Sequence, residues 1–266
     1  MSQRSGSRAV NGRAIPIISI AIVCLVLCST RAFAGRPLTI DDAAPVAKGQ
    51  FELEVGFAHS RPEEGGREQR FPVIGLSYGL FEDLELGVAI QRINVDEKRE
   101  PPVKGFEDLH LTAKYQTAKQ TSHLPDLSFA LYVKIPTANQ RKGLSTGRVD
   151  ENFLVIATKD FSSLALDLNV GYLVVNSPPE EKLKNRTLAG LAIRWKADDR
   201  WVLVSEFFGQ SRKARQDDNE ASFQMGARYS LAPSVVLDAA VGRSLRSVGI
   251  RIQATFGLTW TFPLDF

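Results

Sequence analysis

The sequence predicts an all-β protein, a single antiparallel transmembrane β-barrel of about 12 strands with short periplasmic turns and longer extracellular loops. Its last segment shows why: the even positions from Ile250 to Phe262 are all apolar, and the odd positions between them are polar or glycine. A strand places alternate side chains on opposite faces, so one face of this strand is apolar and the other is polar. The length of this segment suits a tilted membrane-spanning strand of roughly 9–11 residues.

Eleven further segments precede it and read as strands, because most of them alternate in the same way. The first sets Phe51, Leu53 and Val55 against Glu52 and Glu54, and only residues 152–158 are less clearly phased. The segments in order are residues 50–58, 73–78, 84–91, 109–116, 127–135, 152–158, 164–175, 187–196, 201–209, 223–230, 235–242 and 249–262.

The connections between these segments alternate in length, which is the second observation. Long, charged connections are residues 59–70, 95–106, 137–149, 176–186 and 210–221, and short ones are residues 79–83, 159–163, 197–200 and 231–234. Only residues 117–125 and 243–248 are of intermediate length. Bacterial outer-membrane barrels have an even strand number, short periplasmic turns and long extracellular loops. A soluble β-sandwich or lipocalin-like barrel is the alternative, but it has no reason to sort its loops by length.

The third observation is an export signal. An apolar run from residue 14 to 28 follows Arg4, Arg8 and Arg13, and Ala32-Phe33-Ala34 provides a small-x-small cleavage site. We therefore expect a cleaved signal peptide at residues 1–34, a periplasmic lead-in at 35–49 that is able to enter the lumen, and a barrel at 50–266. An uncleaved membrane anchor is the alternative. The expected location is the outer membrane of a Gram-negative bacterium.

Composition excludes several functions of the mature chain. Both cysteines, Cys24 and Cys28, lie in the leader, which excludes disulfides, thiolate metal sites and a cysteine nucleophile. The leader also holds four arginines and no acidic residue, so the mature chain has 33 − 4 = 29 basic and 30 acidic residues. This balance gives no reason to expect nucleic acid as a partner. We expect no cofactor and no metal.

Several motifs resemble a known family. The segment YGLFEDLELG at residues 78–87 resembles the YGLxDxLELG signature of bacterial outer-membrane proteins labelled meta-pathway phenol-degradation, or transporter-like, proteins. Residues 105–115 are similar to that family's GxGD…K-aromatic segment, with Glu107 in place of the second glycine. Residues 133–137, 169–172 and 201–206 resemble its later landmarks. The resemblance implies a barrel that takes up small solutes, among them hydrophobic or aromatic compounds.

The inward face of the predicted barrel carries charges of both signs. Because a charge facing lipid at the bilayer midplane costs roughly 2–4 kcal/mol, charged strand residues are expected inside. They favour either a narrow channel for ions or small polar solutes, or a filled structural or binding barrel, and the strand number lies between the two cases. The lumen-lining candidates are Glu52, Glu54, Glu85, Lys114, Lys134, Asp167, Arg194, Lys196, Glu206, Arg228, Asp238 and Arg251.

Aromatic residues near strand ends are typical of an interfacial girdle rather than of a ligand site. The expected girdle is Tyr78, Tyr172, Trp195, Trp201, Trp260 and Phe262. Trp260, Phe262 and the terminal Phe266 also resemble the signal by which the barrel-assembly machinery recognises outer-membrane proteins. Expected partners are therefore this machinery, outer-membrane lipid and lipopolysaccharide, and a small solute.

A barrel lipid hydrolase is the remaining alternative. It needs a nucleophile within hydrogen-bond reach of a histidine. The adjacent residues His59 and Ser60, at the end of the first strand, are the best candidates, and His110 shares the inner face of its strand with Thr112. Isolated histidines at strand ends are more often interfacial or loop residues, so we do not expect an enzyme.

Overall fold

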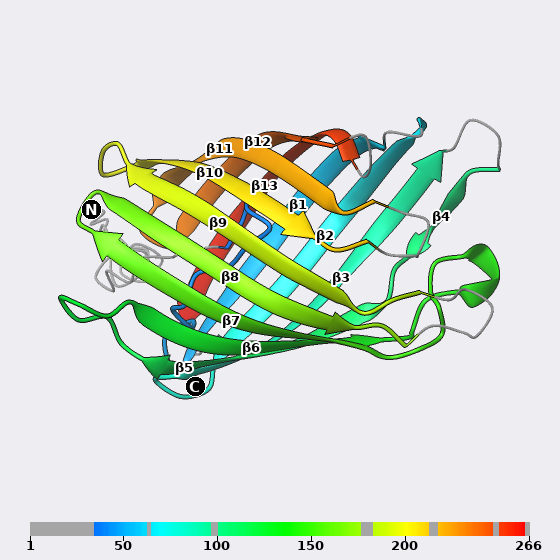
Figure 1. Cartoon of the computed structure of the whole chain (residues 1–266). Coiled ribbons are helices and arrows are strands. Elements are labelled where there is room, and N and C mark those ends of the chain that lie inside the picture. The colour runs from blue at the N-terminus through cyan, green and yellow to red at the C-terminus, as the bar shows by residue number, and fades with distance from the viewer. Residues whose placement is uncertain are drawn as a thin grey trace, which may run out of the picture. The chain divides into compact units, whose positions relative to one another are not determined.

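The computed structural model describes residues 35–62, 65–96, 101–176, 183–212, 218–246 and 250–263. It contains one 3₁₀ helix, η1 (Gln140–Lys142), and otherwise strands joined by turns and loops (Figure 1). The strands are β1 (Gln50–Pro62), β2 (Arg67–Gly79), β3 (Leu84–Asp96), β4 (Val103–Phe106), β5 (Leu109–Ala118), β6 (Asp126–Ile135), β7 (Asp150–Phe161), β8 (Leu164–Val174), β9 (Arg186–Lys196), β10 (Trp201–Gln210), β11 (Glu220–Ala232), β12 (Val235–Ser244) and β13 (Ile250–Pro263).

The sheet closes on itself. Each strand pairs antiparallel with the next, and β1 pairs with both β2 and β13. Strand β3 pairs with β5 over its first half and with the short β4 over its second half. Because β4 and β5 together fill one position, the closed barrel has 12 strand positions. Among the described residues, closure gives each of the 12 positions a neighbour on both sides, and only the short β4, which pairs with β3 alone, has a second edge without a strand partner.

All 12 predicted strands are confirmed, but two predicted loops are partly wrong. Residues 59–62 and 67–70 continue β1 and β2, and β3 continues to Asp96 and pairs with β4. Alternation of apolar and polar residues does not predict these extensions, because backbone hydrogen bonds hold the ladder there and do not need apolar side chains. The last strand is described from Ile250, so Gly249 lies outside the described residues.

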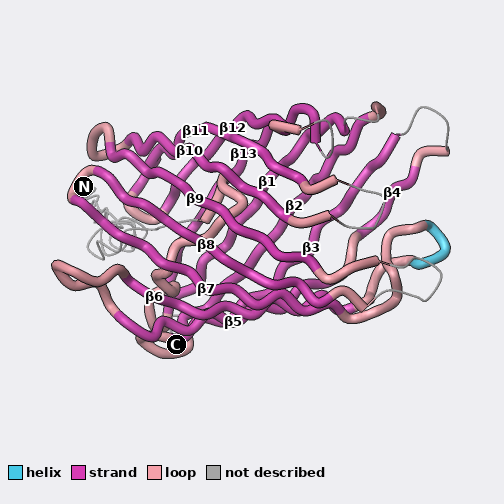
Figure 2. The backbone as a smooth tube through the Cα atoms, in the orientation of Figure 1, coloured by secondary structure: helices cyan, strands magenta, loops and turns pink. Residues whose placement is uncertain are grey.

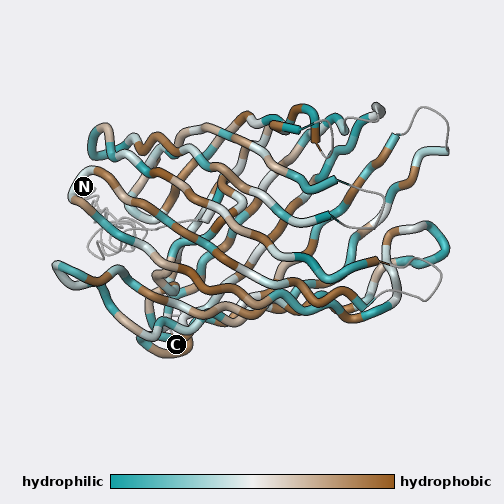
Figure 3. The backbone as a smooth tube through the Cα atoms, in the orientation of Figure 1, coloured by the Kyte–Doolittle hydropathy of each residue, from teal (hydrophilic) through white to brown (hydrophobic). Residues whose placement is uncertain are grey.

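Hydrophilic and hydrophobic residues alternate along many of the strands (Figure 3), and the two faces of the wall differ in polarity. Buried polar residues point inward, among them Glu85, Asn169 and Glu206. Large apolar residues point outward and are exposed, among them Leu111, Phe129, Leu168 and Phe207. Among the residues that the structure describes, no helix is long and apolar enough to cross a membrane.

A segment without regular secondary structure precedes β1 and lies within the barrel (Figure 2). We call residues 35–48 the strap. Its last residue, Lys48, forms an isolated parallel bridge with Gly79 at the end of β2, and Gly49 then leads into β1 with a φ of 77°. Polar contacts described below join the strap to strands all around the wall.

The outward apolar face makes a depth-dependent prediction. Leu191 lies outward in the middle of β9, and Leu164 lies outward at the start of β8, beside a short turn. Leu191→Arg should lower the free energy of unfolding in lipid vesicles by roughly 2–4 kcal/mol, because the arginine faces hydrocarbon near the midplane. Leu164→Arg should cost about 0–1 kcal/mol. Guanidinium titration measures the free energy of unfolding of both variants. Equal losses for Leu191→Arg and Leu164→Arg would contradict the outward position of Leu191 near the midplane.

Candidate functional site

The strap is held at its start by two arginines. Arg228 Nε and Nη2 donate to the carbonyl oxygens of Arg36 and Gly35 at 2.6 and 2.9 Å. The Arg36 guanidinium in turn pairs with Asp238 at 3.3 Å and donates to the carbonyl oxygen of Phe256 at 3.1 Å. The backbone N–H of Arg36 donates to Glu54 at 3.4 Å. These contacts fix the strap against β1, β11, β12 and β13.

Two glycines in the wall make room for the Arg36 side chain. Gly56 of β1 and Gly257 of β13 are direct partners in the ladder. A Cβ at Gly56 would lie 2.4 Å from the guanidinium carbon, and one at Gly257 would lie 2.6 Å from its nitrogens. Glycine at both positions leaves room for the guanidinium at the β1–β13 seam, and a Cβ at either position would force it to shift.

The next turn of the strap binds β10 and β11. Glu206 accepts the backbone N–H groups of Thr39 and Ile40 at distances of 2.9 to 3.1 Å. Gln224 donates to Glu206 at 2.7 Å and to the carbonyl oxygen of Pro37 at 3.1 Å. Gly190 of β9 makes room for the strap in the same way as Gly56 and Gly257, because a Cβ there would lie 2.3 Å from the Ile40 side chain.

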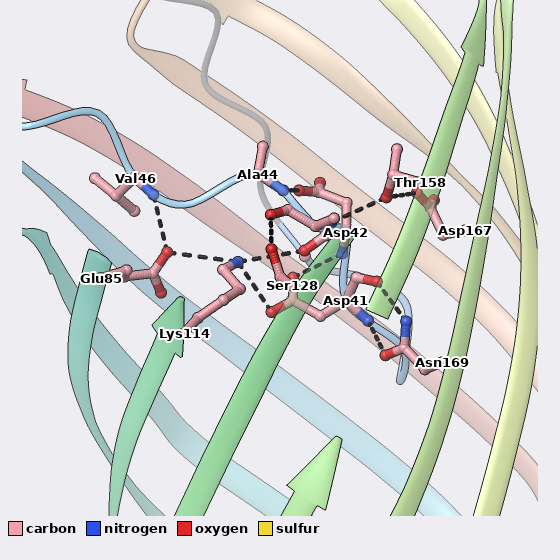
Figure 4. A network of polar contacts seen from close by, with 12 residues as sticks. Asp41, Asp42, Ala44, Val46, Glu85, Lys114, Ser128, Thr158, Asp167 and Asn169 are labelled. Carbon is pink, nitrogen blue, oxygen red and sulfur yellow. Dashed lines mark hydrogen bonds and ion pairs between the residues drawn. The ribbon is translucent and has the colours of Figure 1, made fainter. Parts of the chain in front are cut away.

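Asp41 and Asp42 enter a buried ionic network (Figure 4). Lys114 lies 3.1 Å from Asp41 and 3.4 Å from Glu85. Arg194 donates to both oxygens of Asp167 at 2.6 and 2.9 Å and lies 3.8 Å from Asp42. Breaking one member of a buried ion pair typically costs 3–5 kcal/mol, because the other charge is left unpaired.

Neutral groups complete the network. Asn169 accepts the backbone N–H of Asp41 at 2.9 Å and donates to its carbonyl oxygen at 2.7 Å. Thr158 accepts from the backbone of Ala43, whose carbonyl oxygen accepts from the Ser128 hydroxyl. Val46 donates to Glu85 at 2.9 Å. In this order the strap crosses from β8 past β7 and β6 to β3.

One line of polar groups does not take part in these contacts. Thr255, Thr259 and Thr261 of β13 and Ser60 of β1 lie on the inner face along the β1–β13 seam, and their hydroxyl oxygens are buried. None of the four has a hydrogen-bond partner among the residues that the structure describes. Arg36 lies over Gly257, between Thr255 and Thr259. We call these four residues the hydroxyl line.

The structure places most of the predicted lumen residues in or beside the network. Glu85, Lys114, Asp167, Arg194, Glu206, Arg228 and Asp238 are buried there, and Glu52 and Glu54 lie half-buried on the inner face of β1. The other three lie apart. Lys134 pairs with Asp150 at 2.6 Å and Asp108 at 3.6 Å, Lys196 pairs with Asp199 at an exposed turn, and Arg251 is exposed.

The network also contains residues that sequence reasoning missed. Arg36 belongs to the segment that the sequence predicts only as a lead-in. Thr158, Asn169 and Gln224 carry no charge, so a search for inward charges does not select them. Asn169 and Gln224 are polar residues on otherwise apolar strands and at inward positions, which is the signal that could have found them.

The predicted girdle lies at both ends of the wall. Trp195, Trp201 and Trp260 are exposed beside the short turns, and Tyr172 is exposed near the opposite end. Tyr78 and Phe262 both pack on Phe51, with ring centroids 4.7 and 5.6 Å apart. Of the predicted assembly signal, Phe266 lies outside the described residues, as does the signal peptide.

The hydrolase candidates do not come together. Ser60 points inward and His59, its neighbour on β1, points outward, where its register partner on β2 is Gln69. Adjacent residues of a strand face opposite sides, so this pair is unable to form a nucleophile–base contact. The pair was the wrong candidate for a hydrolase site.

Solved structures with a similar fold are outer-membrane barrels. The COG4313 outer membrane channel from Pseudomonas putida F1 matches with a TM-score of 0.70 at 16% identity, over 85% of this chain and 100% of that one. The KdgM porin matches with a TM-score of 0.54 at 8% identity, over 79% and 99% of the two chains. The translocator domain of the autotransporter NalP from Neisseria meningitidis matches with a TM-score of 0.53 at 11% identity, over 81% and 89%. These likenesses establish the fold.

No curated protein matches this chain in sequence. A family model does match, over residues 34–262, which is nearly the whole of the chain after the predicted leader. The chain therefore belongs to the family described as "Putative MetA-pathway of phenol degradation".

Proposed function

We propose that this protein is an outer-membrane channel for small solutes, with a passage along the β1–β13 seam that the strap closes. The proposal includes export by the signal peptide at residues 1–34 and insertion by the barrel-assembly machinery. The observation that carries it is the hydroxyl line. Four buried hydroxyls without a partner follow the inner face of the seam, and Arg36 of the strap lies across them.

The energetics of these hydroxyls favour opening. A buried polar group without a hydrogen bond costs about 1–3 kcal/mol, and water that enters the seam satisfies it. The strap itself is held by hydrogen bonds and ion pairs, with only a small apolar cluster around Ala43. Hydrogen bonds exchange with water at a net cost of about 0.5–1.5 kcal/mol each, so a polar strap is easier to displace than an apolar plug.

The solute class follows from the family and from the wall. The family description names phenol degradation, and a line of hydroxyls is able to exchange hydrogen bonds with a phenolic hydroxyl. We therefore propose small aromatic compounds that carry a polar group as the solutes.

A non-conducting barrel is the second candidate function. The observation that favours it is the pairing in the network, where Lys114 and Arg194 each lie close to two carboxylates. In that case the strap is a permanent core for the barrel, and its displacement only unfolds the protein.

Locking the strap separates the two functions. The mature chain has no cysteine, and a Cβ at Gly190 would lie 2.3 Å from Cγ2 of Ile40. A disulfide joins Cβ atoms about 3.5–4.5 Å apart, which this geometry allows after Ile40→Cys and Gly190→Cys. We expect the oxidised double variant to show much lower single-channel conductance in planar bilayers than the same protein after reduction.

The two single-cysteine variants are the controls, and reduction should leave their conductance unchanged. Equal conductance before and after reduction would show that the strap does not close the passage. A refolded, heat-modifiable barrel that conducts in neither state would reject the channel and leave the second candidate.

The Arg36 side chain gives a second prediction. Arg36→Ala should raise single-channel conductance several-fold, since it uncovers the seam between Gly56 and Gly257. It should also shift ion selectivity towards cations, because it removes a positive charge from the passage. Lys119→Ala, at an exposed lysine in a turn outside the barrel, is the control. Reversal potentials in a salt gradient measure the shift, and an unchanged potential would place the passage elsewhere.

A further inference from the structure

The wall is irregular where β2 carries a bulge. Between Gly56 and Ala58 of β1 there is one residue, Phe57, but the facing stretch of β2 between Val73 and Arg70 holds two, Phe71 and Pro72. The same shift appears towards β3, where Arg92 faces the bulge. A bulge leaves an extra residue out of the ladder and bends its strand. The three strands therefore do not form a flat surface here.

A pocket of about 390 Å³ lies at this bulge. It is lined by Phe57, Phe71 and Phe256 and by Gln69, Arg92 and Asn94. The register places these side chains on the outer face, since Gln69 is paired with Asn94 and Phe57 with Phe256. Phe71 and Phe256 are each 58% exposed. The pocket therefore opens towards lipid and not towards the strap.

The height of the pocket on the wall follows from the strand geometry. Phe57 is six residues beyond Phe51, which packs in the aromatic cluster beside the short turns. At about 3.3 Å per residue and a tilt near 40°, Phe57 lies about 15 Å above that cluster, and Gln69 and Asn94 lie about 20 Å above it. The apolar band of such barrels is about 25 Å tall, so the polar end of the pocket lies within about 5 Å of its extracellular edge, a distance that long polar side chains span.

Arg92 is out of place on a lipid-facing wall. It is exposed, and it has no ion pair or hydrogen bond among the residues described in the structure. An outward arginine costs free energy that grows with depth in the apolar band. A bound anion offsets that cost, and a phosphate is the anion that arginine matches best. The three phenylalanines that line the same pocket match an acyl chain.

We propose that this pocket binds a phosphorylated, acylated lipid of the outer leaflet, with lipid A as its chemical class. Arg92 contacts a phosphate, Gln69 and Asn94 donate to the sugar or phosphate oxygens, and an acyl chain packs between Phe57, Phe71 and Phe256. Gln69 and Asn94 lie two positions nearer the surface than Phe57, and the long Arg92 side chain, which starts level with Phe57, reaches towards the headgroup. The lipid fills the outer side of the bulge, where the sheet alone is irregular.

The test is binding of lipid A to the refolded mature protein in detergent, measured by native mass spectrometry and by titration. Arg92→Glu should weaken binding by about tenfold or more, the equivalent of losing one charge-assisted contact. Arg92→Lys should lose less, because the charge remains. Phe256→Ala should weaken binding through the acyl chain, by a smaller factor. Lys119→Glu removes an equal charge at the opposite end of the wall and should leave binding unchanged.

Three competitors identify the ligand. Dephosphorylated lipid A should bind to the unaltered protein about as weakly as lipid A binds to the Arg92→Glu variant, and neither inorganic phosphate nor phosphatidylethanolamine should displace lipid A. Equal lipid A binding by the unaltered protein and by Arg92→Glu would overturn the proposal. Displacement by inorganic phosphate alone would show a simple anion site, and displacement by phosphatidylethanolamine an unspecific lipid surface, and either would also overturn it. Heat-modifiable migration of each variant confirms that it is folded.

Discussion

Charge inside the barrel has to be paired, and the strap supplies much of the pairing. The lumen presents Arg194, Glu206, Arg228 and Asp238 from the neighbouring strands β9 to β12, and Lys114 from β5. Without the strap, these groups would rely on water or on one another. The strap offers Arg36, two aspartates and a series of backbone N–H and carbonyl groups, and each meets a complementary wall residue. A buried charge is stable only when it is paired and hydrogen-bonded, so wall and strap depend on each other.

The fit between strap and wall is also steric. Gly56, Gly190 and Gly257 lie where a Cβ would meet Arg36 or Ile40. A barrel with larger residues at these three positions would fold with the same ladder, but it would have no place for this strap. The contrast with the hydroxyl line is informative. At the β1–β13 seam the strap bonds to Glu54 and to the carbonyl oxygen of Phe256, but the four hydroxyls of the hydroxyl line have no partner among the described residues.

The outer face follows a different constraint, because lipid replaces the strap as its neighbour. Most outward side chains are apolar, and Arg92 at the β2 bulge is an exception. The same principle applies to both faces: the polar residues on a face indicate what that face contacts. On the inside the contact is the strap, and on the outside we propose a phosphorylated lipid.

The sequence by itself determined the 12 strand positions, their inward and outward faces, the order of short and long connections and most of the charged residues of the lumen. It did so because alternation, turn composition and lipid exclusion act within one strand at a time. It did not determine that residues 35–48 cross the lumen or that Arg36 lies on Gly56 and Gly257. It also did not determine that the side chains of His59 and Ser60 have no site in common. Only the tertiary structure decided those points, because they depend on which residues of distant strands meet when the sheet closes, and on the β2 register shift.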